Sequence, residues 1–159
     1  MSSIKELIGS DSTFTCTLAS LGSGSSREST AVNNTSDLFL DVLVQLQIKS
    51  GASGTATTGY VNIYAYGTCD SGTTYTEGAT GSDAGITLTS PTNLRLIGRI
   101  NVVANAITYK GSPMSVAAAF GGSMPRKWGI VVENQSGGSL DSTEGNHLKL
   151  YTGVKAQVV

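Results

Sequence analysis

The chain has 159 residues, a length that suits one domain and allows a core to form without a metal or disulfide. Charged residues make up only 13% of the chain and the formal net charge is −1, which argues against nucleic acid as a partner. No apolar run approaches the ~20 residues of a membrane span, so we expect no membrane partner.

The chain is expected to begin with a short N-terminal arm, residues 1–12, ahead of a single domain, residues 13–159. Within the arm, Ser3 followed by Glu6 resembles a helix cap and predicts a short helical turn. Three apolar side chains of this arm have no obvious place in the domain, and we predict that they contact a neighbouring protein. They are Ile4, Leu7 and Ile8.

Alternating apolar and polar side chains dominate the rest of the chain and indicate β-strands. The strongest signal spans residues 37–49, where the apolar series from Leu38 to Ile48 is expected to face the core. The apolar series from Leu148 to Val158 is expected to do the same. Further strands are predicted at residues 13–19, 28–33, 59–67, 86–89, 94–103, 114–119 and 128–134.

This pattern of about eight short strands with turn-rich links favours a sandwich or barrel over parallel βαβ units. Eight strands in two sheets is the jelly-roll arrangement. We therefore expect an all-β fold: an antiparallel β-sandwich, jelly-roll-like, with about eight strands and a short N-terminal arm.

Residues suited to catalysis are sparse. His147, the one histidine, follows a turn and is interpreted as solvated, and a triad needs a positioned base. Cys16 and Cys69 are interpreted as reduced thiols, too few for a zinc site even with the histidine. Carboxylates around residues 70–84 lack the spacing of a calcium loop. We expect no catalytic site, no metal and no cofactor.

Three tyrosines share one face of the strand predicted at residues 59–67, because alternate side chains of a strand point the same way. They are Tyr60, Tyr64 and Tyr66. This face has three interpretations: a platform for sugar rings, a protein interface, or an apolar layer covered by a loop. Trp128 is expected to lie in the core.

Two stretches resemble a known family. The first runs over residues 37–55 (DLFLDVLVQLQIKSGASGT) and 61–67 (VNIYAYG). The second comprises residues 91–98 (PTNLRLIG), 115–122 (SVAAAFGG) and 128–134 (WGIVVEN). Over most of the chain beyond residue 36, these stretches resemble small structural proteins of tailed-bacteriophage virions.

The resemblance implies a non-enzymatic virion protein, foremost a capsid decoration (cement) protein that binds across neighbouring capsid subunits and stabilises the shell. A tail or fibre accessory protein and a carbohydrate-binding module on the virion surface are the alternatives. The implied partners are the major capsid protein or another virion protein, and further copies of the chain in a dimer or trimer. Without a secretion signal, we expect synthesis in the host cytoplasm and a location in the virion.

Overall fold

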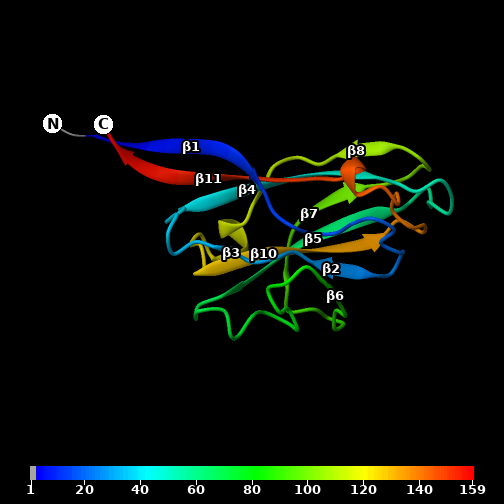
Figure 1. Cartoon of the computed structure of the whole chain (residues 1–159), viewed down its shortest axis with the longest axis horizontal. Helices are drawn as coiled ribbons and strands as arrows, with labels where there is room; N and C mark the ends of the chain where they lie inside the picture. Colours follow the sequence, from blue (N-terminus) through cyan, green and yellow to red (C-terminus); the bar gives the residue numbers. More distant parts are fainter. Residues whose placement is uncertain (1–2) are drawn as a thin grey trace.

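The computed structural model describes residues 3–159 as an all-β protein, with 45% of residues in strands and 4% in helices. Two antiparallel sheets pack face to face and remain open at their edges (Figure 1). The predicted antiparallel sandwich is therefore confirmed. Residues 1 and 2 of the predicted arm lie outside the described residues.

Each sheet joins strands that are distant in sequence. In sheet A the order is β1 (Ile4–Thr13), β11 (Leu148–Val158), β4 (Asp41–Lys49) and β8 (Thr108–Lys110), and β9 (Met114–Ser115) also pairs with β4. In sheet B the order is β6 (Ala84–Ile86), β2 (Ser26–Glu28), β10 (Lys127–Gln135), β5 (Tyr60–Thr68) and β7 (Arg95–Asn101), and β3 (Val32–Asn33) also pairs with β10.

The connectivity is that of a jelly roll. Setting aside the short strands β3, β6 and β9 leaves eight strands. Numbered along the chain, they follow the order 1-8-3-6 in sheet A and 2-7-4-5 in sheet B, as in a jelly roll of eight strands. Two short 3-10 helices, η1 (Ala117–Phe120) and η2 (Glu144–Asn146), lie in the loops.

The core lies between the sheets and follows the predicted alternation in β4. Val42, Val44, Leu46 and Ile48 are all fully or almost fully buried, because alternate residues of the strand face sheet B. Trp128 is fully buried in the same cluster, as expected from the sequence.

Two residues predicted to precede these on the core face are instead exposed. Leu38 is 70% and Leu40 57% exposed, since β4 begins only at Asp41. The side chain of Asn34 holds the preceding residues in a turn: its Oδ1 accepts from Phe39 N at 2.9 Å and its Nδ2 donates to Phe39 O at 3.1 Å. The prediction for Leu38 and Leu40 was wrong because this turn takes them out of the strand.

Strand β11 faces the opposite way from the prediction. Tyr151 pairs with the buried Val44, whereas Leu150 pairs with the exposed Gln45. The apolar series of β11 therefore points away from the core. Tyr151 fills the core position, with its ring 5.4 Å from that of Trp128 in an edge-on arrangement.

The N-terminal residues form a strand rather than the predicted helical turn. Strand β1 pairs with β11 from Ile4 opposite Val158 to Thr13 opposite Leu150. The last residues of β11 continue past the start of β4, so residues 4–8 and 154–158 form a two-stranded ribbon that projects from the sandwich (Figure 1). We call this segment the ribbon.

Candidate protein-binding surface

His147 is buried rather than solvated. Its ring is 2% exposed, Nδ1 accepts from Lys49 N at 3.3 Å, and Nε2 lies 3.0 Å from the Asp141 carbonyl, to which it donates. The prediction was wrong because the η2 turn folds the histidine back against β4. Both ring nitrogens are used by the backbone, so His147 has a structural role.

The carboxylates around residues 70–84 serve separate local structures. Asp70 accepts from the Thr68 hydroxyl at 2.7 Å and from the backbone N–H of Gly72 at 2.7 Å, and these hydrogen bonds hold the pKa of Asp70 well below its usual range. Asp83 pairs with Arg27 at 2.6 Å. Across residues 3–159, no three or more His, Cys, Asp or Glu side chains gather as metal ligands.

The two cysteines are free thiols in different environments. Cys16 is buried in the core cluster, and Cys69 is exposed just after β5. Burial, and secondarily the negative charge of Asp83, raises the pKa of Cys16 to about 12. The thiolate form of Cys16 is therefore strongly disfavoured in the folded protein.

Tyr66 does not belong to an exposed tyrosine face. It is fully buried, its hydroxyl donates to the Ser29 carbonyl at 2.5 Å, and the ring of Tyr75 lies edge-on at 5.5 Å. Tyr75 belongs to the long loop of residues 69–83, which covers this part of sheet B. For Tyr66, the loop-covered interpretation holds and the interface prediction was wrong.

Tyr60 and Tyr64 remain half-buried on the outer face of sheet B, within a polar network. Arg99 lies over the Tyr60 ring at 4.0 Å, and its Nε donates to Asn62 at 2.9 Å. Glu133 accepts from Asn62 at 2.8 Å and from the Tyr64 hydroxyl at 2.9 Å. Burial and the Glu133 hydrogen bond raise the pKa of Tyr64 to about 12, so it stays protonated.

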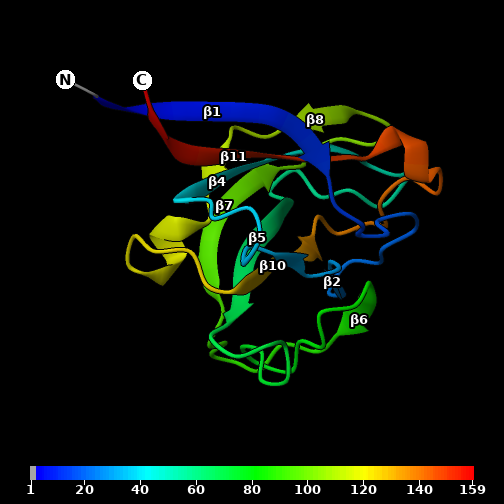
Figure 2. The ribbon, with the colours of Figure 1, turned by 60° about the vertical axis from the view of Figure 1, so that its left-hand side comes forward.

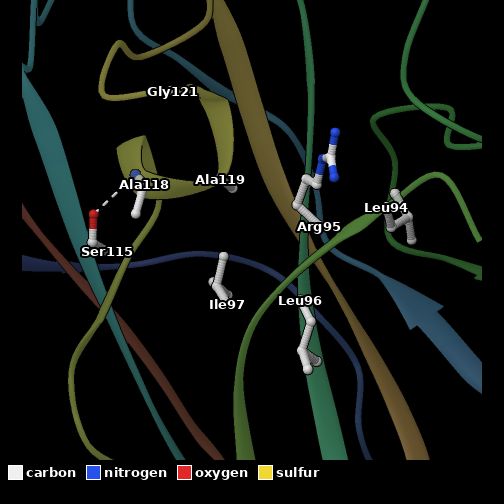
Figure 3. Close-up of a pocket in the computed structure, with 8 residues that line it drawn as sticks. All are labelled: Leu94, Arg95, Leu96, Ile97, Ser115, Ala118, Ala119 and Gly121. Atoms are coloured by element: carbon white, nitrogen blue, oxygen red, sulfur yellow. Dashed lines mark hydrogen bonds between the residues drawn. The ribbon is translucent and has the colours of Figure 1, made fainter.

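A depression of about 640 Å³ lies between β7 and the segment around η1 (Figure 3). Arg95 is the one charged side chain in its lining, and Ser115 Oγ accepts from the backbone of Ala118 at 3.1 Å. The Ser115 hydroxyl in turn donates to the Asp41 carboxylate at 2.7 Å, and Asp41 also accepts from Ala117 N at 2.9 Å, so both side chains hold the segment around η1 against β4.

The ribbon and its adjoining loop gather most of the exposed apolar side chains. Of the eleven large apolar residues exposed among residues 3–159, seven lie here: Ile4, Leu7, Ile8, Leu38, Leu40, Val158 and Val159. Ile4 is 76% exposed and Val158 69%. Monomeric proteins rarely leave large contiguous apolar patches in water, and such patches commonly mark interaction sites.

The structure separates the predicted interface residues into two groups. Ile4, Leu7 and Ile8 all lie on the ribbon, with Ile4 and Ile8 on one face and Leu7 on the other, whereas Tyr60 and Tyr64 lie on the outer face of the other sheet. Leu38 and Leu40 were predicted to face the core and not to be exposed. The turn-forming residues Asn33, Asn34, Ser36 and Asp37 just before them were the available signal.

Comparisons with family models, with curated proteins and with solved structures found no match to this chain. In the described part of the chain, no helix has the length and hydropathy needed to cross a bilayer. The surfaces of the protein and the sequence resemblance are therefore the basis for its proposed function.

Proposed function

We propose that this chain is a non-enzymatic structural protein of a tailed-phage particle, a capsid decoration protein that binds neighbouring capsid subunits through its ribbon. The resemblance of residues beyond 36 to virion proteins supports the setting. The concentration of exposed apolar side chains on the ribbon supports the mode of binding, and it is the observation that carries the proposal.

The ribbon has the physical properties of an adhesive element. Burying one exposed Ile or Leu side chain contributes up to about 1.5–3 kcal/mol, so burial of Ile4, Leu7 and Ile8 against a partner would favour binding. Strand β1 is also the outermost strand of sheet A, and a free strand edge can pair with a partner's strand. Many copies on one shell would add avidity.

The test is binding to bare capsids. The triple variant Ile4→Thr, Leu7→Thr and Ile8→Thr keeps residues that favour strands and removes apolar area from the ribbon. We expect it to bind capsids at least about tenfold more weakly in co-sedimentation and to lose the protection of shells against heat.

The matched control replaces three exposed apolar residues distant from the ribbon: Leu96→Thr, Val103→Thr and Ile107→Thr. Their exposed fractions, 52%, 41% and 48%, are similar to that of Leu7. This control should bind as the wild type does. Equal binding by the ribbon variant and the wild type would disprove the proposed role of the ribbon.

A second candidate function is carbohydrate binding on the virion surface. The network of Tyr60, Asn62, Tyr64, Arg99 and Glu133 favours it, because aromatic rings beside amide, guanidinium and carboxylate groups can stack on and hydrogen-bond sugars. A glycan array would test it. A sugar signal that is lost in both Tyr64→Ala and Glu133→Gln would support this function, and an array without signal would reject it.

A further inference from the structure

A row of side chains crosses the outer face of sheet B. Side chains directly opposite each other in antiparallel strands lie on the same face. Ser26 of β2 lies opposite Ile86 of β6 on one side and opposite Glu133 of β10 on the other. Asn62 of β5 pairs with Glu133, and Arg99 of β7 pairs with Asn62. The row is therefore polar except at its β6 end, and its members in order are Ile86, Ser26, Glu133, Asn62 and Arg99.

The polar groups of this row are used toward β5 and free toward β2. Glu133 Oε2 accepts from Asn62 at 2.8 Å and from the Tyr64 hydroxyl at 2.9 Å. Its other oxygen, Oε1, accepts within residues 3–159 only from Gln135, at 3.0 Å. Each carboxylate oxygen has two lone pairs, so Oε1 can accept one more hydrogen bond. The half-buried Ser26 hydroxyl has no hydrogen-bond partner among the same residues.

A depression of about 440 Å³ lies at the β2 end of the row. Ser26 and Glu133 line it with a hydroxyl and a carboxylate, and its aliphatic walls are Leu21, Ile86 and Leu88. Figure 2 shows β2 and β6 in the lower half of the molecule, whereas β1 and β11 lie at the top. Sites for small molecules have volumes in this range and combine apolar walls with a few placed polar groups.

The charge of Glu133 limits the ligands that fit this depression. Burial favours a higher pKa, but the hydrogen bonds that the carboxylate accepts outweigh burial and lower the pKa of Glu133 below its ordinary value. An ionised carboxylate accepts hydrogen bonds and donates none, and it repels anions. The other charged residue of the lining, Arg27, is already paired with Asp83 at 2.6 Å. A ligand with neutral donor groups therefore fits, and an anionic ligand does not.

The tyrosines of the same face offer less room for a ligand. Arg99 lies over the Tyr60 ring at 4.0 Å, so one side of that ring is occupied. Tyr64 donates its hydroxyl hydrogen to Glu133. The depression at the β2 end is the part of this face where polar groups remain free beside an open volume.

We propose that this depression binds one ring of a neutral saccharide. Ring hydroxyls donate to Glu133 Oε1 and exchange hydrogen bonds with the Ser26 hydroxyl. The C–H face of the ring packs against the aliphatic walls of the depression. The inference rests on the second candidate function, carbohydrate binding, and deepens it by naming the site and the class of sugar. It involves no residue of the ribbon.

The test is an array of neutral and acidic glycans, probed with the full chain and with Ser26→Leu. The leucine removes the hydroxyl and fills the depression from its floor, so we expect binding to neutral glycans to weaken at least about tenfold. Glu133→Gln should weaken it as well, because the amide nitrogen cannot accept from a ring hydroxyl. The wild type should bind no acidic glycan in preference to its neutral counterpart.

The matched control is Ser123→Leu, which makes the same change at an exposed position outside the depression. It should bind glycans as the wild type does. A second variant, Ser26→Ala, removes the hydroxyl without adding bulk to β2 and should weaken binding severalfold. Thermal unfolding followed by circular dichroism checks that each variant is folded, and Ser26→Ala keeps the test decisive if Ser26→Leu is not.

Three results would overturn the inference: no binding to any neutral glycan, binding to acidic glycans alone, or neutral-glycan binding that survives both Ser26 changes. Binding that survives them but is lost in Tyr60→Ala would place the sugar on the tyrosines and leave the second candidate function standing. Capsid co-sedimentation of Ser26→Leu should equal that of the wild type, because Ser26 lies on sheet B and the ribbon on sheet A. The saccharide site and the ribbon can therefore fail separately.

Discussion

At the scale of single residues, the two thiols make a direct test of the fold. Cys69 is exposed, whereas Cys16 is 1% exposed and its pKa is raised to about 12. Because the thiolate is the reactive form, one thiol per chain should react with Ellman's reagent in the native protein, and the second only after unfolding. Cys69→Ser should abolish the native reaction. Rapid reaction of both thiols would contradict the buried position of Cys16.

The hydrogen bonds and ion pair of the Asp141 carboxylate make the stability of the fold depend on pH. A hydrogen bond from Asn146 at 2.7 Å, another from Thr143 N at 3.0 Å, and the Lys49 ammonium at 3.3 Å lower the pKa of Asp141 to about 2. The folded pKa lies below the ordinary value of 3.8, so this stabilisation is present above about pH 4 and is lost as pH falls toward 2.

Asp141→Asn should therefore lower the melting temperature by a few degrees near neutral pH, and the difference from the wild type should shrink toward pH 2. Calorimetry across this range measures both proteins. A difference that stays constant down to pH 2 would show that the carboxylate charge of Asp141 does not stabilise the fold.

At the scale of elements, Glu28 of β2 holds the loop that covers sheet B. Its side chain is 1% exposed, and its carboxylate accepts from Thr80 N and Thr80 Oγ1 at 2.8 Å and from Gly81 N at 3.1 Å. Glu28→Ala leaves these donors without their acceptor, at a cost of about 1–3 kcal/mol for each one that stays buried. We expect faster proteolysis within residues 72–82, measured by mass spectrometry of the fragments.

The control is Glu6→Ala, which removes a carboxylate from an exposed strand position. It should leave cleavage of the loop unchanged. If Glu28→Ala and Glu6→Ala were cut at the same rate as the wild type, the loop would be held by its other contacts, such as Tyr75 against Tyr66.

The sequence predicted the strands but not always which side faces the core. Alternation located β4, β5 and β10 and the burial of Trp128. In β11, however, the alternation shows only that odd- and even-numbered residues lie on opposite faces. It does not show which of the two faces is turned toward the core. Tyr151 decides the orientation by filling space beside Trp128, a long-range contact that the local pattern does not contain.

Residues 14–19 show a different limit. Phe14, Cys16 and Leu18 are buried as the alternation predicts, yet the segment is not part of a strand ladder. Its backbone donates to side chains instead: Thr17 N to Asp83 at 2.9 Å and Leu18 N to Glu144 at 2.8 Å. The ribbon could not be predicted from the sequence for a similar reason. It depends on the pairing of β1 with β11, which places Ile4 beside Val158 although the two residues are at opposite ends of the chain.

At the scale of the whole molecule, the two terminal strands contribute unequally to folding. Every residue of β1 is exposed, whereas β11 lies between β1 and β4 in sheet A and contributes Tyr151 to the core. Deleting residues 1–8 should therefore preserve a cooperative urea transition followed by Trp128 fluorescence. Deleting residues 148–159 should abolish that transition. Loss of cooperativity in the first deletion would mean that the ribbon is needed for folding as well as for binding.

The two ends of the described chain meet, because Ser3 and Val159 exchange backbone hydrogen bonds in both directions at 2.9 Å. A peptide or protein fused to either end of the chain would therefore lie at the tip of the ribbon (Figure 1). A purification tag there would obstruct the proposed capsid contact, whereas an epitope inserted into the mostly exposed loop of residues 52–58 would leave that contact free. Because the two ends are close, a short linker could join them, and a circular permutant could then have its new termini in a surface loop away from the ribbon.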